Sequence, residues 1–152
     1  MAFPNIFSKE TSGQVIDRIN RLNATSQANW GKMNVAQMLA HCNVTYEMVY
    51  DDIHPKPNAF LKFIFKMVVK KKVVTETPYP KNGKTAPAFI ITGDKNIENE
   101  RTRLINYISK TQQLGETHFD NKESHSFGSL SKTEWNNLFY KHLDHHLRQF
   151  GV

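Results

Sequence analysis

Residues 131–151 read SKTEWNNLFYKHLDHHLRQFG and carry the clearest helix signal in the chain. Ser131 and Glu134 match a capping box, in which the serine side chain accepts a hydrogen bond from the third helical residue and the glutamate reaches back to the cap. Gly151 is a typical helix end. Side chains at helical spacing share one face between these signals: Trp135, Leu138, Phe139, His142, His146 and Gln149. The pattern predicts a helix that packs into a core and carries two histidines on its packed face.

Four further helical patterns precede this helix. They cover residues 12–22, a helix from Asn34 that ends before the proline-containing stretch 54–57, residues 58–73, and a helix from Asp94 to near Gly115. The connections 75–92 and 116–130 are rich in polar residues or proline and are predicted to be irregular, with at most a short extended piece at 88–91. No pair of strands is predicted. Five helices joined in this way predict an all-α bundle of antiparallel neighbours.

Composition and charge narrow the class of protein. The chain has 152 residues, 39% of them hydrophobic and 22% charged, which fits a single folded domain over 1–152. Its net charge of +6 favours loose attraction to polyanions but identifies no nucleic-acid binder. The only cysteine, Cys42, has no internal disulfide partner. No secretion signal opens the sequence, and residues 59–74 are too short and too often interrupted by lysine to span a bilayer. We therefore expect a cytoplasmic protein with no membrane partner.

The histidines are the main functional lead. His142 and His146 are four residues apart, so their side chains emerge one turn apart on the same helix face. His41 lies on the apolar face of the second helix, and packed helices are close enough for one histidine from each side to share an ion. Three histidines with an open fourth position are typical of a catalytic metal site. Zinc, nickel and iron all accept imidazole, with zinc and nickel preferred here. The alternative interpretation is that these are hydrogen-bonded core histidines.

Other residues near this face have weaker assignments. His125 precedes the last helix and is a candidate pocket residue, as is Gln149 on the histidine face. His145 and Asp144 are interpreted as surface residues or as partners of a metal ligand. His54 and His118 are interpreted as ordinary loop residues. No general acid or base is identified, and no motif for an organic cofactor is present.

Three stretches together resemble the DinB/YfiT-like superfamily of metal-dependent helix-bundle proteins. They are Trp30–Met33 followed by Gln37–His41, His125–Gly128 followed by Glu134 and Trp135, and 142–150, which resembles the closing H-x-x-x-H-x-x-Q helix of that superfamily. The residues of these motifs are most similar to a branch of the superfamily that is described as a domain of unknown function. The resemblance implies a four-helix bundle, often dimeric, in which His41, His142 and His146 bind a divalent metal. Residues 58–73 would then be an extra helical segment between the second and third core helices.

Three hypotheses about function follow. The first is a metal-dependent enzyme; the resemblance implies a transferase that activates a small thiol, and a hydrolase is the other option. The second is a non-catalytic protein that binds a metal or a small ligand. The third is an interaction module using the basic residues of 62–72, although lysines that cover an apolar helix explain these equally simply. The apolar stretch 60–69 is a candidate homodimer surface.

Overall fold

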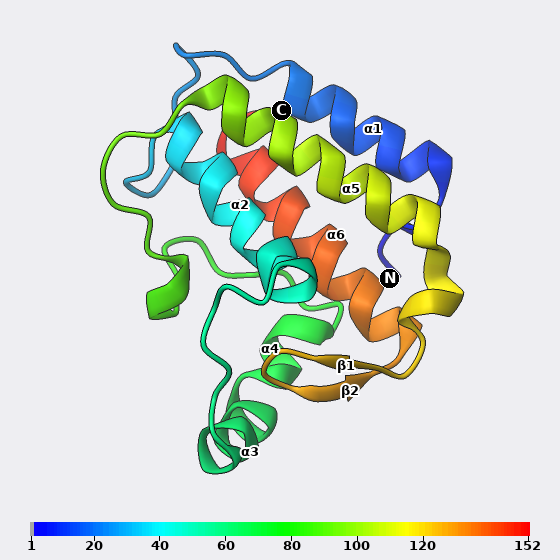
Figure 1. Ribbon diagram of the computed structural model, residues 1–152. Coiled ribbons are helices and arrows are strands. Elements are labelled where there is room, and N and C mark those ends of the chain that lie inside the picture. Colours follow the sequence, from blue (N-terminus) through cyan, green and yellow to red (C-terminus); the bar gives the residue numbers. More distant parts are fainter. Residues whose placement is uncertain (1) are drawn as a thin grey trace.

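The computed structural model describes residues 2–152, and this part of the chain is mostly helical. The described residues form six α-helices and one small hairpin, arranged as in Figure 1. The helices are α1 (Lys9–Asn20), α2 (Val35–Tyr50), α3 (Ala59–Val68), α4 (Lys70–Val74), α5 (Ile97–Phe119) and α6 (Lys132–Gln149). A 3-10 turn, η1, covers Pro87–Phe89, and the antiparallel strands β1 (Lys122–Ser124) and β2 (Gly128–Leu130) pair between α5 and α6.

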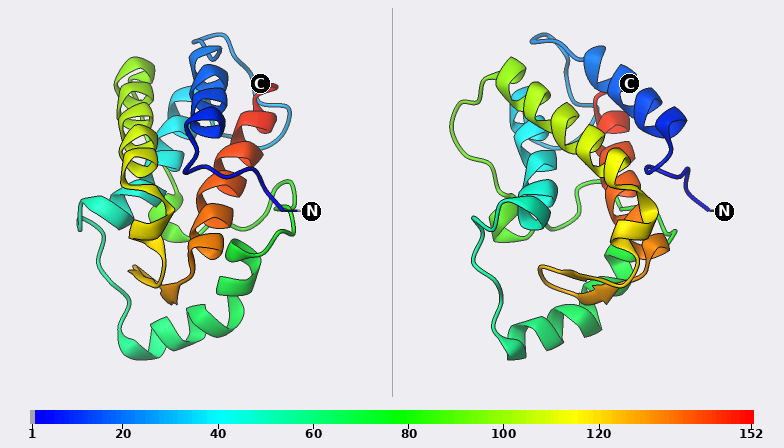
Figure 2. Two further views of the ribbon diagram at one scale, coloured as in Figure 1. Left: turned by 90° about the vertical axis from the view of Figure 1, so that its right-hand side faces the viewer. Right: turned by 45° about the vertical axis from the view of Figure 1, so that its right-hand side comes forward.

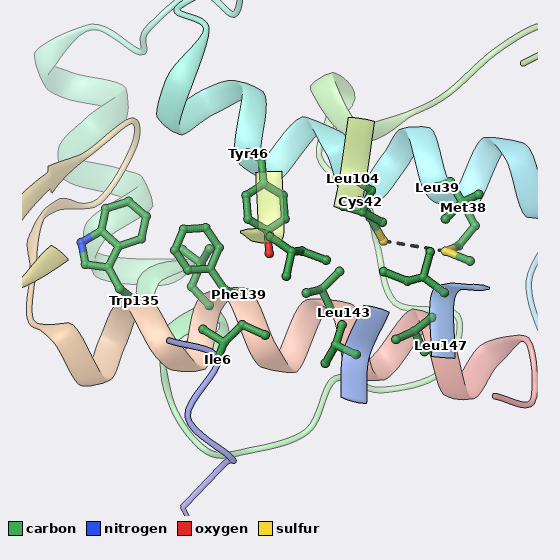
Figure 3. Close-up of a cluster of buried hydrophobic side chains, with 14 of the residues drawn as sticks. Ile6, Met38, Leu39, Cys42, Tyr46, Leu104, Trp135, Phe139, Leu143 and Leu147 are labelled. Atoms are coloured by element: carbon green, nitrogen blue, oxygen red, sulfur yellow. Dashed lines mark hydrogen bonds between the residues drawn. The ribbon is translucent and has the colours of Figure 1, made fainter. Parts of the chain in front are cut away.

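The four longest helices enclose one hydrophobic core. Helix α5 packs against α1 and α2, and α6 packs against all three (Figures 1 and 2). Phe139 of α6 stacks on Tyr46 of α2 and on Trp135, and both Phe139 and Ile108 of α5 are inaccessible to solvent. Figure 3 shows how side chains from these helices and the N-terminal segment meet: Ile6, Met38, Leu39, Cys42, Tyr46, Leu104, Trp135, Phe139, Leu143 and Leu147. This core fixes α2 and α6 side by side.

The capping signals of α2 and α6 are confirmed. Asn34 accepts from the backbone of Gln37, whose side chain accepts from the backbone of Asn34, and Ser131 and Glu134 repeat the arrangement on α6. The expected starts of the other two core helices were less accurate. Helix α1 begins at Lys9, earlier than the expected residue 12, because Ser8 accepts a capping bond from Thr11 N. Asn96 caps α5 in the same way.

The connection 116–130 is more regular than predicted. Gly115 does not end the helix: its φ of 73° produces a kink, and α5 resumes as far as Phe119. Phe119 is inaccessible to solvent and packs on Phe7, Trp135 and Phe139, so core burial continues the helix beyond the glycine. The hairpin follows, against the expectation of no paired strands. Ser124 stabilises it by donating to Gly128 O and accepting from Phe127 N.

The segment expected to form one helix over 58–73 forms two, with the break at Val69. Helix α3 stands apart from the core helices and buries none of its residues (Figures 1 and 2). Helix α4 packs against α6. Lys141 fixes the chain that follows, since its Nζ donates to the carbonyl oxygens of Lys72, Thr75 and Thr77 at 2.9, 2.6 and 3.1 Å. Neither α3 nor any other helix in residues 2–152 combines the length and the apolar character needed to cross a bilayer.

Candidate metal centre

Three histidines from two helices meet beside the core. Helix α2 supplies His41, and α6 supplies His142 and His146 from successive turns. One ligand atom from each lies within 4.8 Å of the others, and the two Nε2 atoms of His41 and His142 are 3.0 Å apart. His41 and His146 are buried, and His142 is partly buried. The sequence reasoning selected the same three residues, and the packing of α2 on α6 brings them together.

The partners of two Nδ1 atoms fix the protonation of their rings. His41 Nδ1 lies 2.8 Å from the carbonyl oxygen of Phe89, and because a carbonyl can only accept, Nδ1 carries the proton. His146 Nδ1 lies 2.8 Å from Oε1 of Gln149. The amide orientation of Gln149 is set by its Nε2, which donates to the carbonyl oxygen of Trp30 at 2.6 Å. Both rings therefore keep a lone pair on Nε2, the form in which a histidine binds metal.

A glycine makes the contact between Gln149 and the 30–33 loop possible. Gly31 has a φ of 83°, and a Cβ at that position would lie 2.6 Å from Nε2 of Gln149. Any other residue would be strained in this conformation and would displace the Gln149 amide. The close approach lets Trp30 hold Gln149, and Gln149 in turn orients His146.

The partner of His142 is compatible with either tautomer of its ring. The Nδ1 atom of the ring lies 2.9 Å from the hydroxyl oxygen of Thr45, which can donate or accept. When Thr45 donates, His142 Nε2–H can donate to His41 Nε2. When Thr45 accepts, the two Nε2 lone pairs face each other at 3.0 Å, an arrangement that a cation between them would stabilise. The donor set therefore fits a divalent metal ion.

The surroundings keep the three imidazoles neutral. Burial lowers the pKa of His41 and, together with the neighbouring histidines, lowers that of His142 well below its usual value. Burial and the nearby His41 lower the pKa of His146 to about 3. Neutral imidazole is the metal-binding form, so no proton has to be displaced from these rings near pH 7.

The cluster lies on the wall of an open cavity of about 1980 Å³. Gln149 lines this cavity next to His146, and His125 lines it farther away, near the hairpin turn. His125 Nε2 lies 3.2 Å from the carbonyl oxygen of His54, and its Nδ1 lies 2.8 Å from the hydroxyl of Ser126. The structure thus brings Gln149 to the histidine cluster, whereas His125 joins the hairpin to the 51–58 connection.

Sequence reasoning missed several residues of the site. The Phe89 carbonyl was overlooked because 75–92 was expected to be irregular, with at most a short extended piece at 88–91, whereas Pro87 begins the η1 turn that directs this carbonyl to His41. Thr45, one turn after His41 on α2, was not identified as a partner of His142. Tyr79 makes edge-on contacts with His142 and His145 from a connection with no regular structure. The sequence offered one signal for an orienting partner: Gln149, whose side-chain amide oxygen lies three residues after His146 on the same helix.

Two residues have different surroundings from those expected. His54 was interpreted as an ordinary loop residue, but its Nε2 lies 2.8 Å from Oε2 of the buried Glu47, which also pairs with Arg103. Asp144 was interpreted as a surface residue or a partner of a metal ligand, but it is buried and pairs with Arg18 and Arg148, at 2.8 Å in both cases. His145 contacts the Trp30 ring and lines the cavity.

Comparison with known proteins places the chain in a family. The model of a family described as "Protein of unknown function (DUF1569)" matches residues 7–151. This span runs from the segment before α1 through α6 and includes the three histidines and their partners. No curated protein and no solved structure matches the chain.

Proposed function

Because the chain belongs to the DUF1569 family of proteins of unknown function, we propose a function from the site itself: His41, His142 and His146 bind a divalent metal ion. The observation that carries the proposal is the orientation of the rings. Acceptors at two Nδ1 atoms leave Nε2 lone pairs, and the hydroxyl of Thr45 allows the third ring to do the same. A purely structural buried histidine also pairs its Nδ1, so the proposal depends on the convergence of three such rings, with one ligand atom of each within 4.8 Å of the others.

We assign the fold to the DinB/YfiT-like four-helix bundles. The assignment is supported by the four long helices α1, α2, α5 and α6 around one core, and by a first histidine on α2 with two more on the last helix. Helices α3 and α4 then form an extra segment between the second and third core helices. This placement agrees with the short motifs of the sequence, which lie on α2 and the loop before it, on the hairpin and on α6.

Zinc and nickel are the metals that suit this donor set best, followed by iron. All three donors are imidazole nitrogens, which these ions accept readily. Cys42, the neighbour of His41, is not a ligand: its Sγ lies 3.8 Å from Sδ of Met38 within the core, and burial raises its pKa. A thiol kept protonated in an apolar environment is a poor metal ligand.

The reaction class that we propose is metal-dependent group transfer, to a thiol or to water. A divalent ion held by three histidines supplies a Lewis acid to a thiol, a water molecule or a carbonyl group. The protein residues orient the rings through Phe89, Thr45 and Gln149, and the aromatic rings of Phe89 and Tyr79 shield one side of His142 from water. Three protein ligands are the number found in catalytic rather than structural zinc sites.

One observation favours a second function, binding without catalysis. No aspartate or glutamate is among the described residues that line the cavity, so no carboxylate stands ready as a general base. A metal- or ligand-binding protein needs no such group. Turnover assays with electrophilic substrates, run with and without a small thiol, separate the two functions, because only an enzyme consumes the substrate.

Metal content is the test of the site. We expect elemental mass spectrometry on untagged protein to find about one divalent ion per chain. The double variant His142→Ala, His146→Ala should lose it while keeping its helical circular dichroism. His118→Ala, which removes a histidine near the end of α5, should retain the ion. A parent protein that stays free of metal after incubation with zinc or nickel would overturn the proposal.

A further inference from the structure

The cavity beside the histidines extends much farther than a metal site requires. It has a volume of about 1980 Å³, whereas pockets for small molecules occupy about 300–1,000 Å³. Its wall runs from the histidines on α2 and α6, past the hairpin turn, to α3. Figures 1 and 2 show α3 standing away from the core helices on this side of the molecule. The space has room for a ligand far larger than a water molecule or a simple thiol.

Most of the wall beyond the histidines is apolar. Every element around the cavity contributes to this apolar wall, through Met48 and Val49 of α2, Leu61 and Phe65 of α3, Phe127 of the hairpin turn and Leu138 of α6. Near the histidines the rings of Tyr79 and Phe89 continue it. Apolar walls with a few polar groups at one end are typical of sites for ligands with a hydrophobic body.

Helix α3 contributes one face to this wall. Leu61, Phe65 and Val68 recur at helical spacing and line the cavity. Phe60 and Phe63 lie outside the cavity wall and are 70% and 61% exposed. Lys62 pairs with Glu123 of β1, which ties the helix to the hairpin. The face of α3 that carries Leu61 and Phe65, its inner face, therefore borders the open cavity.

The charged residues that line the cavity are all positive. Its lining contains no aspartate or glutamate among residues 2–152 but includes five lysines: Lys32, Lys56, Lys71, Lys72 and Lys84. Lys56 is paired with Asp52. Lys71 and Lys72 are exposed next to α3. Among the described residues, the four lysines other than Lys56 form no salt bridge. A wall with one sign of charge attracts ligands of the opposite sign.

We propose that this cavity binds an anionic amphiphile, a molecule with a largely apolar body and one anionic group. The apolar body contacts the inner face of α3 and the side chains of α2 and α6. The anionic group is attracted by the surrounding lysines. The inference builds on the proposed function because it names the substrate class of the same site, but the apolar wall and the lysines are independent of any metal.

Binding of short-chain amphiphiles tests the proposal directly. Decanoate, decanol and decyltrimethylammonium share one chain and differ in charge, and each is titrated into the protein by isothermal calorimetry below its micelle concentration. We expect saturable binding of decanoate, at least tenfold tighter than that of decyltrimethylammonium, with decanol in between. Equal affinity for the anion and the cation would overturn the anionic assignment. Absence of saturable decanoate binding would overturn the whole inference.

A pair of α3 variants locates the binding. Phe65→Glu puts a negative charge on the inner face, and Phe63→Glu puts the same charge on the outer face of the same helix. We expect the first to weaken decanoate binding at least tenfold and the second to leave it within twofold. Leu61→Glu repeats the inner change at a second position. An equal loss in the inner and outer variants would overturn the placement in the cavity.

Two further measurements separate this inference from the metal proposal and from self-association. Titrations of zinc-treated and metal-free protein show whether decanoate binding survives without metal, so each proposal can fail alone. Sedimentation velocity compares the parent with Phe65→Glu. A dimer in the parent that the variant abolishes, without decanoate binding, would mean that a second copy fills the cavity, and this would overturn the inference.

Discussion

Helices α3 and α6 show opposite relations between composition and burial: the more apolar helix, α3, is the less buried of the two. Eight of the ten residues of α3 are apolar, yet none of them is buried. Helix α6 has a lower mean hydropathy and buries ten of its eighteen residues, including Asn137, Lys141, His146 and Gln149. The comparison teaches that the neighbours of a helix decide its burial. Helix α6 packs on three core helices, whereas α3 contacts mainly α4.

The polar residues of α6 are buried because each has a partner. Asn137 donates to the carbonyl oxygen of Val74, Lys141 donates to three carbonyls, and His146 pairs with Gln149. Buried polar groups are tolerated when their hydrogen bonds are made. Helix α6 is thus the rigid element that holds two of the three candidate ligands, while α3 forms a wall that the core does not hold in place.

The largest expected effect concerns stability. Phe139→Ala should lower the free energy of unfolding by about 3–5 kcal/mol, since it empties a fully buried position on α6. Phe63→Ala on α3 should change it by no more than about 0.5 kcal/mol because that ring is already exposed. Urea denaturation followed by circular dichroism measures both. A loss of several kcal/mol for Phe63→Ala would show that another molecule covers the outer face of α3 in solution.

The same contrast explains how far the sequence could be interpreted. The capping boxes at Asn34 and Ser131 and the packed face of α6 are local signals, and the helices α2 and α6 follow from them. The histidine trio could be predicted because its three members lie on these two helices. Helix caps and the packed face of a helix can be predicted from the sequence because each depends on residues within one or two helical turns.

The remaining features depend on contacts distant in sequence. Continuation of α5 through Gly115 depends on burial of Phe119 against α6, and the exposure of α3 depends on where α4 and the hairpin lie. The Phe89 carbonyl reaches His41 across 48 residues. Every residue has a backbone carbonyl, so the sequence does not indicate which carbonyl reaches His41, and this partner could not be predicted.

The next effect concerns metal affinity. Gln149→Leu removes the acceptor that orients His146 while keeping a side chain of similar size. We expect metal affinity to fall about 10- to 100-fold, the usual effect of losing such a partner. Competition with a chromophoric zinc chelator measures the change. Gln113→Leu, at an exposed position of α5, is the matched control and should bind zinc like the parent.

A conservative variant distinguishes orientation from general damage. Gln149→Glu keeps an oxygen acceptor for His146 Nδ1 but loses the bond to the Trp30 carbonyl. Metal affinity should therefore remain within about threefold of the parent, since the ring keeps its orienting partner. Equal losses in Gln149→Leu and Gln149→Glu would show that the contact with Trp30, rather than the orientation of His146, governs the site.

The smallest effect compares two helix caps. Ser131 caps α6 and Asn58 caps α3, and each side chain accepts a backbone hydrogen bond, from Glu134 N and Leu61 N. Ser131→Ala should lower the free energy of unfolding by about 1 kcal/mol. Asn58→Ala should leave it almost unchanged, because fraying of α3 exposes no core, but should speed hydrogen exchange at α3 amides. Equal losses of global stability from the two caps would mean that α3 unfolds together with the core, and the rigid and the loosely held regions would then be one cooperative unit.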